Sequence, residues 1–135
     1  MWAFLSRNRD AGILVMRVGL AFVFIWAHGW PKLAGGVSKW REIGQAMGNV
    51  GVHFWPVFWG LAATLAETLG ALLLGIGLFF KPACMMLGIT MTIAAIHECA
   101  GKGTWRGDGA HAIEMAIVFY SLMFIGAGKY SVDKD

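Results

Sequence analysis

The sequence predicts an all-α membrane protein, a bundle of four transmembrane helices. The 135 residues are 58% hydrophobic and only 14% charged, whereas soluble domains carry about 25% charged residues. The mean hydropathy is correspondingly high, at +0.63. Four apolar segments have about the 20 residues that a helix needs to cross a bilayer, and they lie at 11–30, 54–80, 82–100 and 109–128. We therefore expect one integral membrane domain over residues 1–135.

The first span, 11–30, follows two basic residues, Arg7 and Arg9. No small-residue cleavage site ends it, so we expect it to be retained as a helix rather than removed as a signal peptide. A longer connection follows, in which Trp40, Ile43 and Met47 fall on one side of a helix over 38–47. We interpret this stretch as a short interfacial helix between the first two spans. An irregular loop is the alternative interpretation.

The second span, 54–80, is long enough to tilt and meets the third span, 82–100, at a tight turn before Pro82. Proline is tolerated in the first turn of a helix, so it can open the third span. A glycine-containing turn over 101–108 leads into the fourth span, 109–128. In the second span small residues recur every four positions, a pattern that favours close packing within the bundle or between subunits of a homo-oligomer: Ala62, Ala66 and Gly70.

The charge pattern argues against a nucleic-acid partner and does not give the orientation of the chain in the membrane. The net charge is only +3 and no run of Lys and Arg is dense, so we expect no nucleic-acid partner. Lys and Arg residues are divided equally between the two sides of the predicted membrane, so the positive-inside rule gives no orientation. Cys84 and Cys99 lie on one predicted helix about 22 Å apart, too far for a disulfide bond.

Eight ionisable side chains lie within or at the edges of the spans: Arg17, His28, Lys32, Glu67, His97, Glu98, His111 and Glu114. A charge inside the bilayer costs about 2.5–3.5 kcal/mol on insertion scales, so we expect these groups to face the bundle interior. We call the side of the membrane that bears the long connection between the first two spans the loop side. Arg17 and Glu67 are equally far from the loop-side ends of their spans, which predicts a buried ion pair between them. Glu114 is a rival partner for Arg17. The hydroxyl groups of Thr64 and Thr68 would complete the hydrogen bonding of the Arg17–Glu67 pair. Such a pair is either a structural clamp or a protonatable or anion-binding site.

The remaining ionisable residues gather at the loop-side ends of three spans, where we expect a polar rim pocket: His28, Lys32, His97, Glu98, His111 and Glu114. Histidines and carboxylates at this density can hold a quinone head group, bind a metal or relay protons. His97 and Glu98 are adjacent, so only one of them can point fully inward. The alternative is a polar rim that meets water. Because HExxH, CxxC and CxxCH motifs are absent, neither structural zinc nor covalent haem is supported, and metal binding by the histidines stays open.

Several of these residues occur in a familiar order. Arg17 follows Met16, His28-Gly29 is followed by Lys32, Glu67 is flanked by Ala66 and Thr68, and the chain closes on a glycine pair and a Ser-x-Asp ending, Gly126-Ala127-Gly128-Lys129-Tyr130-Ser131-Val132-Asp133. This order resembles the DoxX family of small four-helix membrane proteins of bacteria and archaea, over residues 16–133. The family often has proline between the closing glycines, where this chain has Ala127. The resemblance implies a multi-pass protein of a prokaryotic cytoplasmic membrane. Through a thiosulfate:quinone oxidoreductase subunit that gives the family its name, it also implies a redox role.

These observations favour an integral membrane subunit of a redox system that holds a quinone or a similar small ligand in the rim pocket. His97, His111 and Glu114 would exchange the accompanying protons, and a protein partner would supply electrons because the sequence has no flavin or haem motif. The chain would then be at most one subunit of a quinone-linked oxidoreductase. Two alternatives remain: a non-catalytic accessory or scaffold subunit of a larger membrane complex, and a small-solute or proton carrier acting as a dimer.

Overall fold

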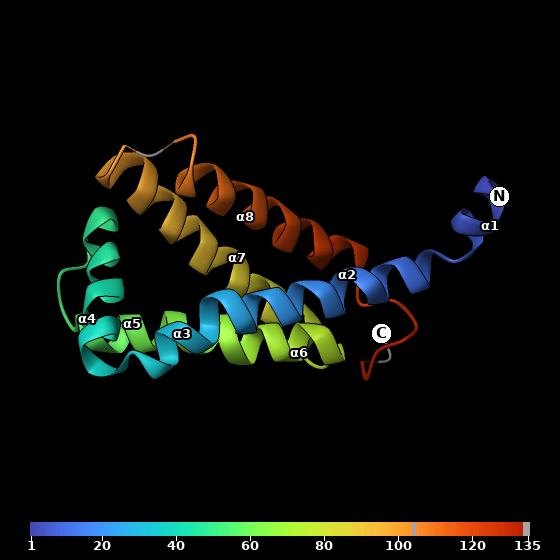
Figure 1. The fold of residues 1–135 in the computed structure, drawn as a ribbon, viewed down its shortest axis with the longest axis horizontal. Coiled ribbons are helices and arrows are strands. Elements are labelled where there is room, and N and C mark those ends of the chain that lie inside the picture. The colour runs from blue at the N-terminus through green and yellow to red at the C-terminus, as the bar shows by residue number, and fades with distance from the viewer. Residues whose placement is uncertain (104, 134–135) are drawn as a thin grey trace.

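The computed structural model describes residues 1–103 and 105–133, in which all regular secondary structure is helical. Four helices are long and apolar enough to cross a membrane: Arg9–Ala34, Pro56–Ile76, Phe80–Gly101 and Asp108–Ile125. The predicted all-α, four-span fold is therefore confirmed. Both ends of the chain lie at the same end of the bundle, as an even number of spans requires (Figure 1).

Three of the spans combine α-helix with a short wider π-helical segment. The first span consists of α2 (Arg9–Val23), the π-helix η1 (Phe24–Gly29) and α3 (Trp30–Ala34), and a short helix, α1 (Trp2–Arg7), precedes it. The second consists of α5 (Pro56–Leu65), the π-helix η3 (Ala66–Gly70) and α6 (Ala71–Ile76). The third consists of α7 (Phe80–Ile96) and the π-helix η4 (His97–Gly101), and the fourth is α8 (Asp108–Ile125).

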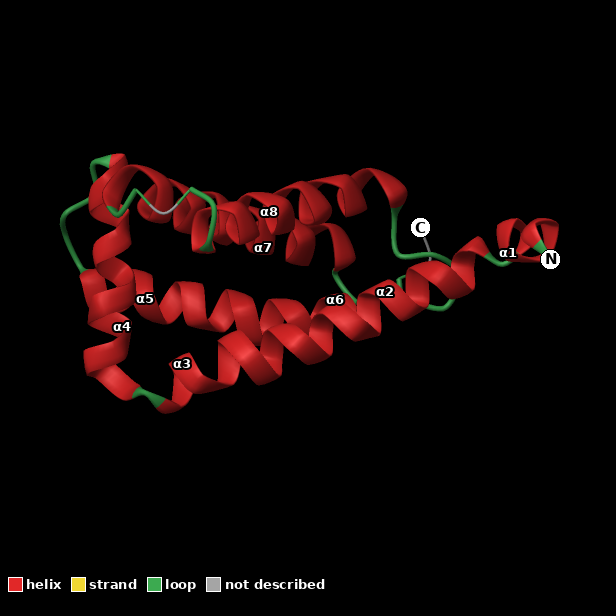
Figure 2. Cartoon of the chain, turned by 45° about the horizontal axis from the view of Figure 1, so that its top comes forward, coloured by secondary structure: helices red, strands yellow, loops and turns green. Residues whose placement is uncertain are grey.

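The spans pack as two antiparallel pairs, α2 against α6 and α7 against α8 (Figures 1 and 2). Their shared core is aliphatic and aromatic, and Leu74, Phe80, Leu87 and Phe119 are fully buried within it. The rings of Phe24 and Phe119 meet edge to face, with centroids 5.1 Å apart, and so join the first span to the fourth. Edge-to-face contact is a favoured arrangement of two aromatic rings.

A helix rather than an irregular loop connects the first two spans. It is α4 (Gly36–Gly44), continued by the 3₁₀-helix η2 (Gln45–Val50), and it runs across the loop end of the bundle (Figure 2). Glycines let its backbone touch that of α5: a Cβ atom at Gly44 would lie 1.6 Å from the carbonyl oxygen of Pro56, and one at Gly60 would lie 1.6 Å from that of Trp40. The Trp40 indole also donates a hydrogen bond of 3.0 Å to the carbonyl oxygen of Lys32. We call this connection, residues 36–50, the cross-helix.

The second span is shorter than the apolar stretch 54–80 suggested. Gly77 has a left-handed backbone (φ +80°), so the helix ends at Ile76, and Phe80 begins α7 instead. The C-terminal tail, residues 126–133, folds back over this turn. The Asp133 carboxylate accepts hydrogen bonds from the backbone N–H groups of Phe79 and Phe80, at 3.1 and 2.8 Å. These groups belong to the N-terminus of α7, where N–H groups lack partners within the helix, so the tail caps that helix.

Candidate functional site

Arg17 is buried, with 1% of its surface exposed, but its partners are carbonyl oxygens rather than a carboxylate. Its guanidinium donates to the carbonyl oxygens of Leu74 (3.1 Å), Gly75 (2.8 Å), Ala127 (2.9 Å) and Tyr130 (2.8 Å). Two of these acceptors lie in the last turn of α6, where carbonyl groups lack helical partners and a positive charge is favourable. Arg17 therefore caps α6 and fastens the C-terminal tail to the bundle.

The predicted Arg17–Glu67 ion pair is consequently wrong, and the reason is the axial stagger of the two helices. Gly29 lies against Thr68, and Ala21 lies against Gly75. This register carries Arg17 to the end of α6 near Gly75, which is eight residues, or about 12 Å of helix, from Glu67. Equal distances from the estimated span ends did not mean equal depth.

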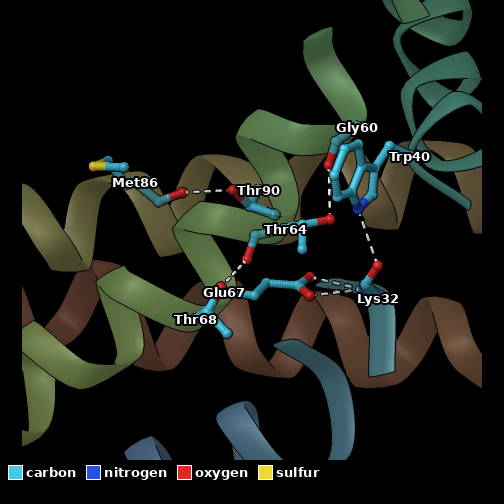
Figure 3. Close-up of polar contacts among 8 residues, drawn as sticks. All are labelled: Lys32, Trp40, Gly60, Thr64, Glu67, Thr68, Met86 and Thr90. Atoms are coloured by element: carbon cyan, nitrogen blue, oxygen red, sulfur yellow. Dashed lines mark hydrogen bonds and ion pairs between the residues drawn. The ribbon is translucent and has the colours of Figure 1, made fainter. Parts of the chain in front are cut away.

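Glu67 instead pairs with Lys32, which the sequence had placed in the rim. The Lys32 ammonium donates to both carboxylate oxygens of Glu67, at 2.7 and 2.9 Å (Figure 3). The Glu67 side chain is 3% exposed and that of Lys32 is 28% exposed, so the pair is largely removed from solvent. An ammonium group has three donor hydrogens and a carboxylate has about four acceptor positions. The pair therefore keeps one donor and further acceptor capacity for another molecule.

Thr64 and Thr68 were predicted to complete the hydrogen bonding of the Arg17–Glu67 pair, and this prediction is also wrong. Thr64 donates to the carbonyl oxygen of Gly60 at 2.8 Å, and Thr68 donates to that of Thr64 (Figure 3). Hydroxyl groups on helices commonly satisfy themselves on the carbonyl four residues earlier. The Glu67 carboxylate thus relies on Lys32.

The ion pair lines a cavity of about 350 Å³ beneath the cross-helix. Besides Lys32 of the first span, three elements form its walls: the cross-helix contributes Ile43 and Met47, the second span Trp59 and Ala63, and the third span Ile89 and Ile93. Apart from Lys32 and Glu67, the lining side chains are mostly apolar, and the Thr90 hydroxyl is already bonded to the Met86 carbonyl oxygen at 2.8 Å. An apolar cavity of roughly 300–1,000 Å³ with a few converging polar groups is typical of small-molecule sites.

Glu67 stands on a π-helical segment, and so do three of the rim residues. Glu67 belongs to η3, His28 to η1, and His97 and Glu98 to η4. Segments of this kind arise from one extra residue in a helical turn and are frequent at functional sites. Here η1 and η3 pack against each other, so the segment that carries His28 lies on the segment that carries Glu67.

Two of the predicted rim histidines meet. The rings of His28 and His111 are stacked, with centroids 5.5 Å apart and an interplanar angle of 27°. His28 is half-buried and His111 is exposed, so the pair reaches from the bundle interior to its surface. His28 also interacts electrostatically with Glu67 and Lys32.

The other rim residues do not join this group. His97 bonds through Nδ1 to the Asn49 side-chain oxygen at 2.7 Å, which fastens the cross-helix to the third span. Glu98 forms an ion pair with Lys102 at 3.2 Å, and Glu114 is exposed on α8. We expected His28, either His97 or Glu98, His111 and Glu114 to form one group; the structure brings His28 and His111 together and places His97 and Glu114 elsewhere. Within residues 1–103 and 105–133, no three His, Cys, Asp or Glu side chains are grouped so that they could hold a metal ion.

The cavity contains a residue that the sequence did not single out. Trp59 lines it, and its indole N–H is buried without a hydrogen-bond partner among the described residues. The sequence carries seven tryptophans, and apolar residues surround this one on both sides in the chain. Only the packing of α5 against the cross-helix distinguishes it from an anchor at the membrane surface.

Comparisons with known proteins identify the family of this chain. The DoxX family model matches residues 12–98, which is more than half of the chain. An uncharacterized protein of Haemophilus influenzae is 31% identical over 136 residues, covering 96% of this chain and 93% of the relative. No solved structure matches the chain. The chain belongs to the DoxX family of membrane proteins.

Proposed function

We propose that this protein is a membrane subunit of a redox system and binds a quinone, or a similar small molecule, in the cavity beneath the cross-helix. The observation that carries the proposal is the Lys32–Glu67 ion pair, 2.7 Å long, set in the wall of an otherwise largely apolar cavity of about 350 Å³. In such surroundings the attraction between the two charges is smaller than the free energy lost by removing them from water, unless their geometry is very good. Ligand binding would explain why the protein has a charged pair in the wall of this cavity.

The donor and acceptor groups of the pair fit a quinone head group. The remaining Lys32 hydrogen can be donated to a ligand carbonyl oxygen, and a Glu67 oxygen can accept from a ligand hydroxyl. The apolar walls of the cavity suit the ring and the start of a hydrocarbon tail. A bound quinone supplies two-electron, two-proton redox chemistry. Lys32 and Glu67 would orient its head group, exclude water from it and hold the proton to be exchanged.

This proposal moves the site from the rim histidines to the cavity beneath the cross-helix. Of the six rim candidates, Lys32 lines the cavity, whereas the other five do not: His28, His97, Glu98, His111 and Glu114. We further propose a location in the cytoplasmic membrane of a prokaryote, in keeping with the bacterial relative. A protein partner would supply electrons, because the sequence has no flavin or haem motif. The small-residue stripe of the second span leaves a homo-oligomer open.

A non-catalytic accessory role is the second candidate, and Arg17 favours it. Four of the five N–H donors of this buried charge are used in capping α6 and fastening the tail. Arg17 therefore serves packing, and Lys32 and Glu67 could likewise serve only to dock the first span on the second.

Ligand binding separates the two. The purified protein in quinone-free nanodiscs would be titrated with decylubiquinone, and binding followed by tryptophan fluorescence, since Trp59 lines the cavity. Filling the cavity by Ala94→Phe should abolish saturable quenching. The double variant Lys32→Met/Glu67→Gln leaves no unpaired charge and should weaken binding about tenfold or more, since one hydrogen bond to a charged group contributes at least about 1.5 kcal/mol.

Glu114→Gln is the matched control, because Glu114 is exposed and does not line the cavity. It should bind like the wild type. Equal quenching of the wild type, Ala94→Phe and the double variant would overturn the proposed site and favour the accessory role.

A further inference from the structure

The stacked rings of His28 and His111 join α8 to η1, and η1 packs on the segment that carries Glu67. His111 is the fourth residue of α8 and is exposed, next to the polar connection that joins α7 to α8. His28 lies beneath it in η1, with the ring centroids 5.5 Å apart. The second side-chain torsion of histidine is broad. A modest ring rotation or one bridging water would therefore bring ring nitrogens of the two residues into hydrogen-bonding reach.

On its inner side, His28 adjoins the segment that carries Glu67. η1 packs on η3, and a Cβ atom placed on Gly29 would lie 3.2 Å from the Glu67 carbonyl oxygen. The charged and titratable groups that act on His28 are Glu67 and Lys32 within the bundle and His111 toward the surface. His28 is therefore stacked on an exposed histidine and belongs to a segment that packs on the one carrying the buried Glu67.

We propose that His111 and His28, in that order, conduct protons from the water at the loop end of the bundle to Glu67. This inference rests on the proposed function, because it supplies the protons that a bound quinone would take up. It assigns to His28 and His111 a role different from direct ligand contact.

The transfers balance at each step. A protonated His111 gives a ring N–H proton to a ring nitrogen of neutral His28 and is itself reprotonated from water. Protonated His28 then gives a proton to a carboxylate oxygen of Glu67 and returns to the neutral form. The Glu67 carboxyl, still beside the Lys32 ammonium, holds the proton until a ligand oxygen accepts it and Glu67 is again ionised. Histidine suits both steps because its ordinary pKa lies near neutral pH.

A competing route would enter through the cavity itself, since the Lys32 side chain is 28% exposed. The walls there are mostly aliphatic and aromatic, and an occupying ligand would displace water from them. The histidine route stays open when the cavity is filled. The two routes differ in whether loss of the His28 imidazole slows protonation of Glu67.

The test follows protonation of Glu67 directly. Its carboxyl band is identified in steady-state infrared spectra as the band missing from Glu67→Gln. At the pH midpoint of that band, a laser flash on a caged proton starts the reaction, and time-resolved infrared absorption follows the band in nanodiscs. His28→Ala should slow its rise about tenfold or more, in line with the contribution of a positioned acid–base group, and leave the final amplitude unchanged. Added imidazole should restore the rate, which a purely structural defect would not allow.

His111→Ala should also slow the rise, whereas His53→Ala, at another exposed histidine, should match the wild type. An unchanged rate in His28→Ala would overturn the route in favour of entry through the cavity. A Glu67 that stays ionised at every pH at which the protein is folded would overturn it too.

Decylubiquinone binding to the same samples is measured separately. Loss of the histidine effect with intact binding refutes the route alone, and absent binding with an intact histidine effect refutes the proposed function alone.

Discussion

Replacing Arg17 with methionine should destabilise the protein severely, because it removes four hydrogen bonds at once. The guanidinium donates to the carbonyl oxygens of Leu74, Gly75, Ala127 and Tyr130 at 2.8–3.1 Å. Hydrogen bonds to charged groups contribute about 1.5–3 kcal/mol each in soluble proteins, and those between membrane helices average about 0.6 kcal/mol. With the membrane average and the lower value for soluble proteins as bounds, four bonds place the expected loss in free energy of unfolding at about 2–6 kcal/mol.

The assay is unfolding by sodium dodecyl sulfate in mixed micelles, followed by far-ultraviolet circular dichroism. Arg9→Gln is the control, because Arg9 is exposed and should change stability by no more than about 0.5 kcal/mol. Arg17→Lys should fall between wild type and Arg17→Met, since its ammonium cannot reach carbonyl groups of two separate segments as a fork does.

A double variant distinguishes this account from a direct ion pair. Arg17 and Glu67 share no partner, so the effects of Arg17→Met and Glu67→Gln should add to within about 0.5 kcal/mol. A coupling energy well above that value, or a loss below about 1 kcal/mol for Arg17→Met, would refute the reasoning.

Three further results are expected from the same unfolding assay. Gly60→Ala should lower stability by about 1–3 kcal/mol or more, the range for overpacking, because the new Cβ would lie 1.6 Å from a cross-helix carbonyl oxygen. Gly19→Ala is the control and should not lower stability, because the space around Gly19 is open. Lys32→Met should be more harmful than Lys32→Met/Glu67→Gln, since the single change leaves a buried carboxylate unpaired. Asp133→Asn should cost about 1 kcal/mol through a weaker cap on α7, and an unchanged midpoint would contradict that role.

The sequence predicted the four spans well because helices that lie in lipid are long and apolar, and hydropathy detects such segments directly. It also anticipated the cross-helix, since Trp40, Ile43 and Met47 repeat with helical spacing. The end of the second span was harder to place, because Gly77 and Phe79 break the helix while the stretch remains apolar to Phe80. Hydropathy measures how apolar a segment is and is insensitive to a turn made of apolar residues.

The site was predicted less well because two quantities have no signal in hydropathy. The first is axial stagger, which carried Arg17 away from Glu67 and brought Lys32 to it. The second is the direction in which each helix faces. His111 and Glu114 share a helix face by spacing, yet both are exposed. Helices that are apolar on all sides do not mark which face is inside, and a π-helical turn shifts the residues that follow it.

The central claim is that the cavity beside Lys32 and Glu67 receives the ligand, and photolabelling tests it most directly. An azido-substituted ubiquinone analogue would be cross-linked to the protein in nanodiscs and the labelled positions mapped by mass spectrometry, with decylubiquinone as competitor. We expect competed labels within 43–47, 59–67 and 86–94, where the cavity lining lies, and their loss in Ala94→Phe. Competed labels confined to the rim at 97–98 or 111–114, or labels that persist in Ala94→Phe, would contradict the account.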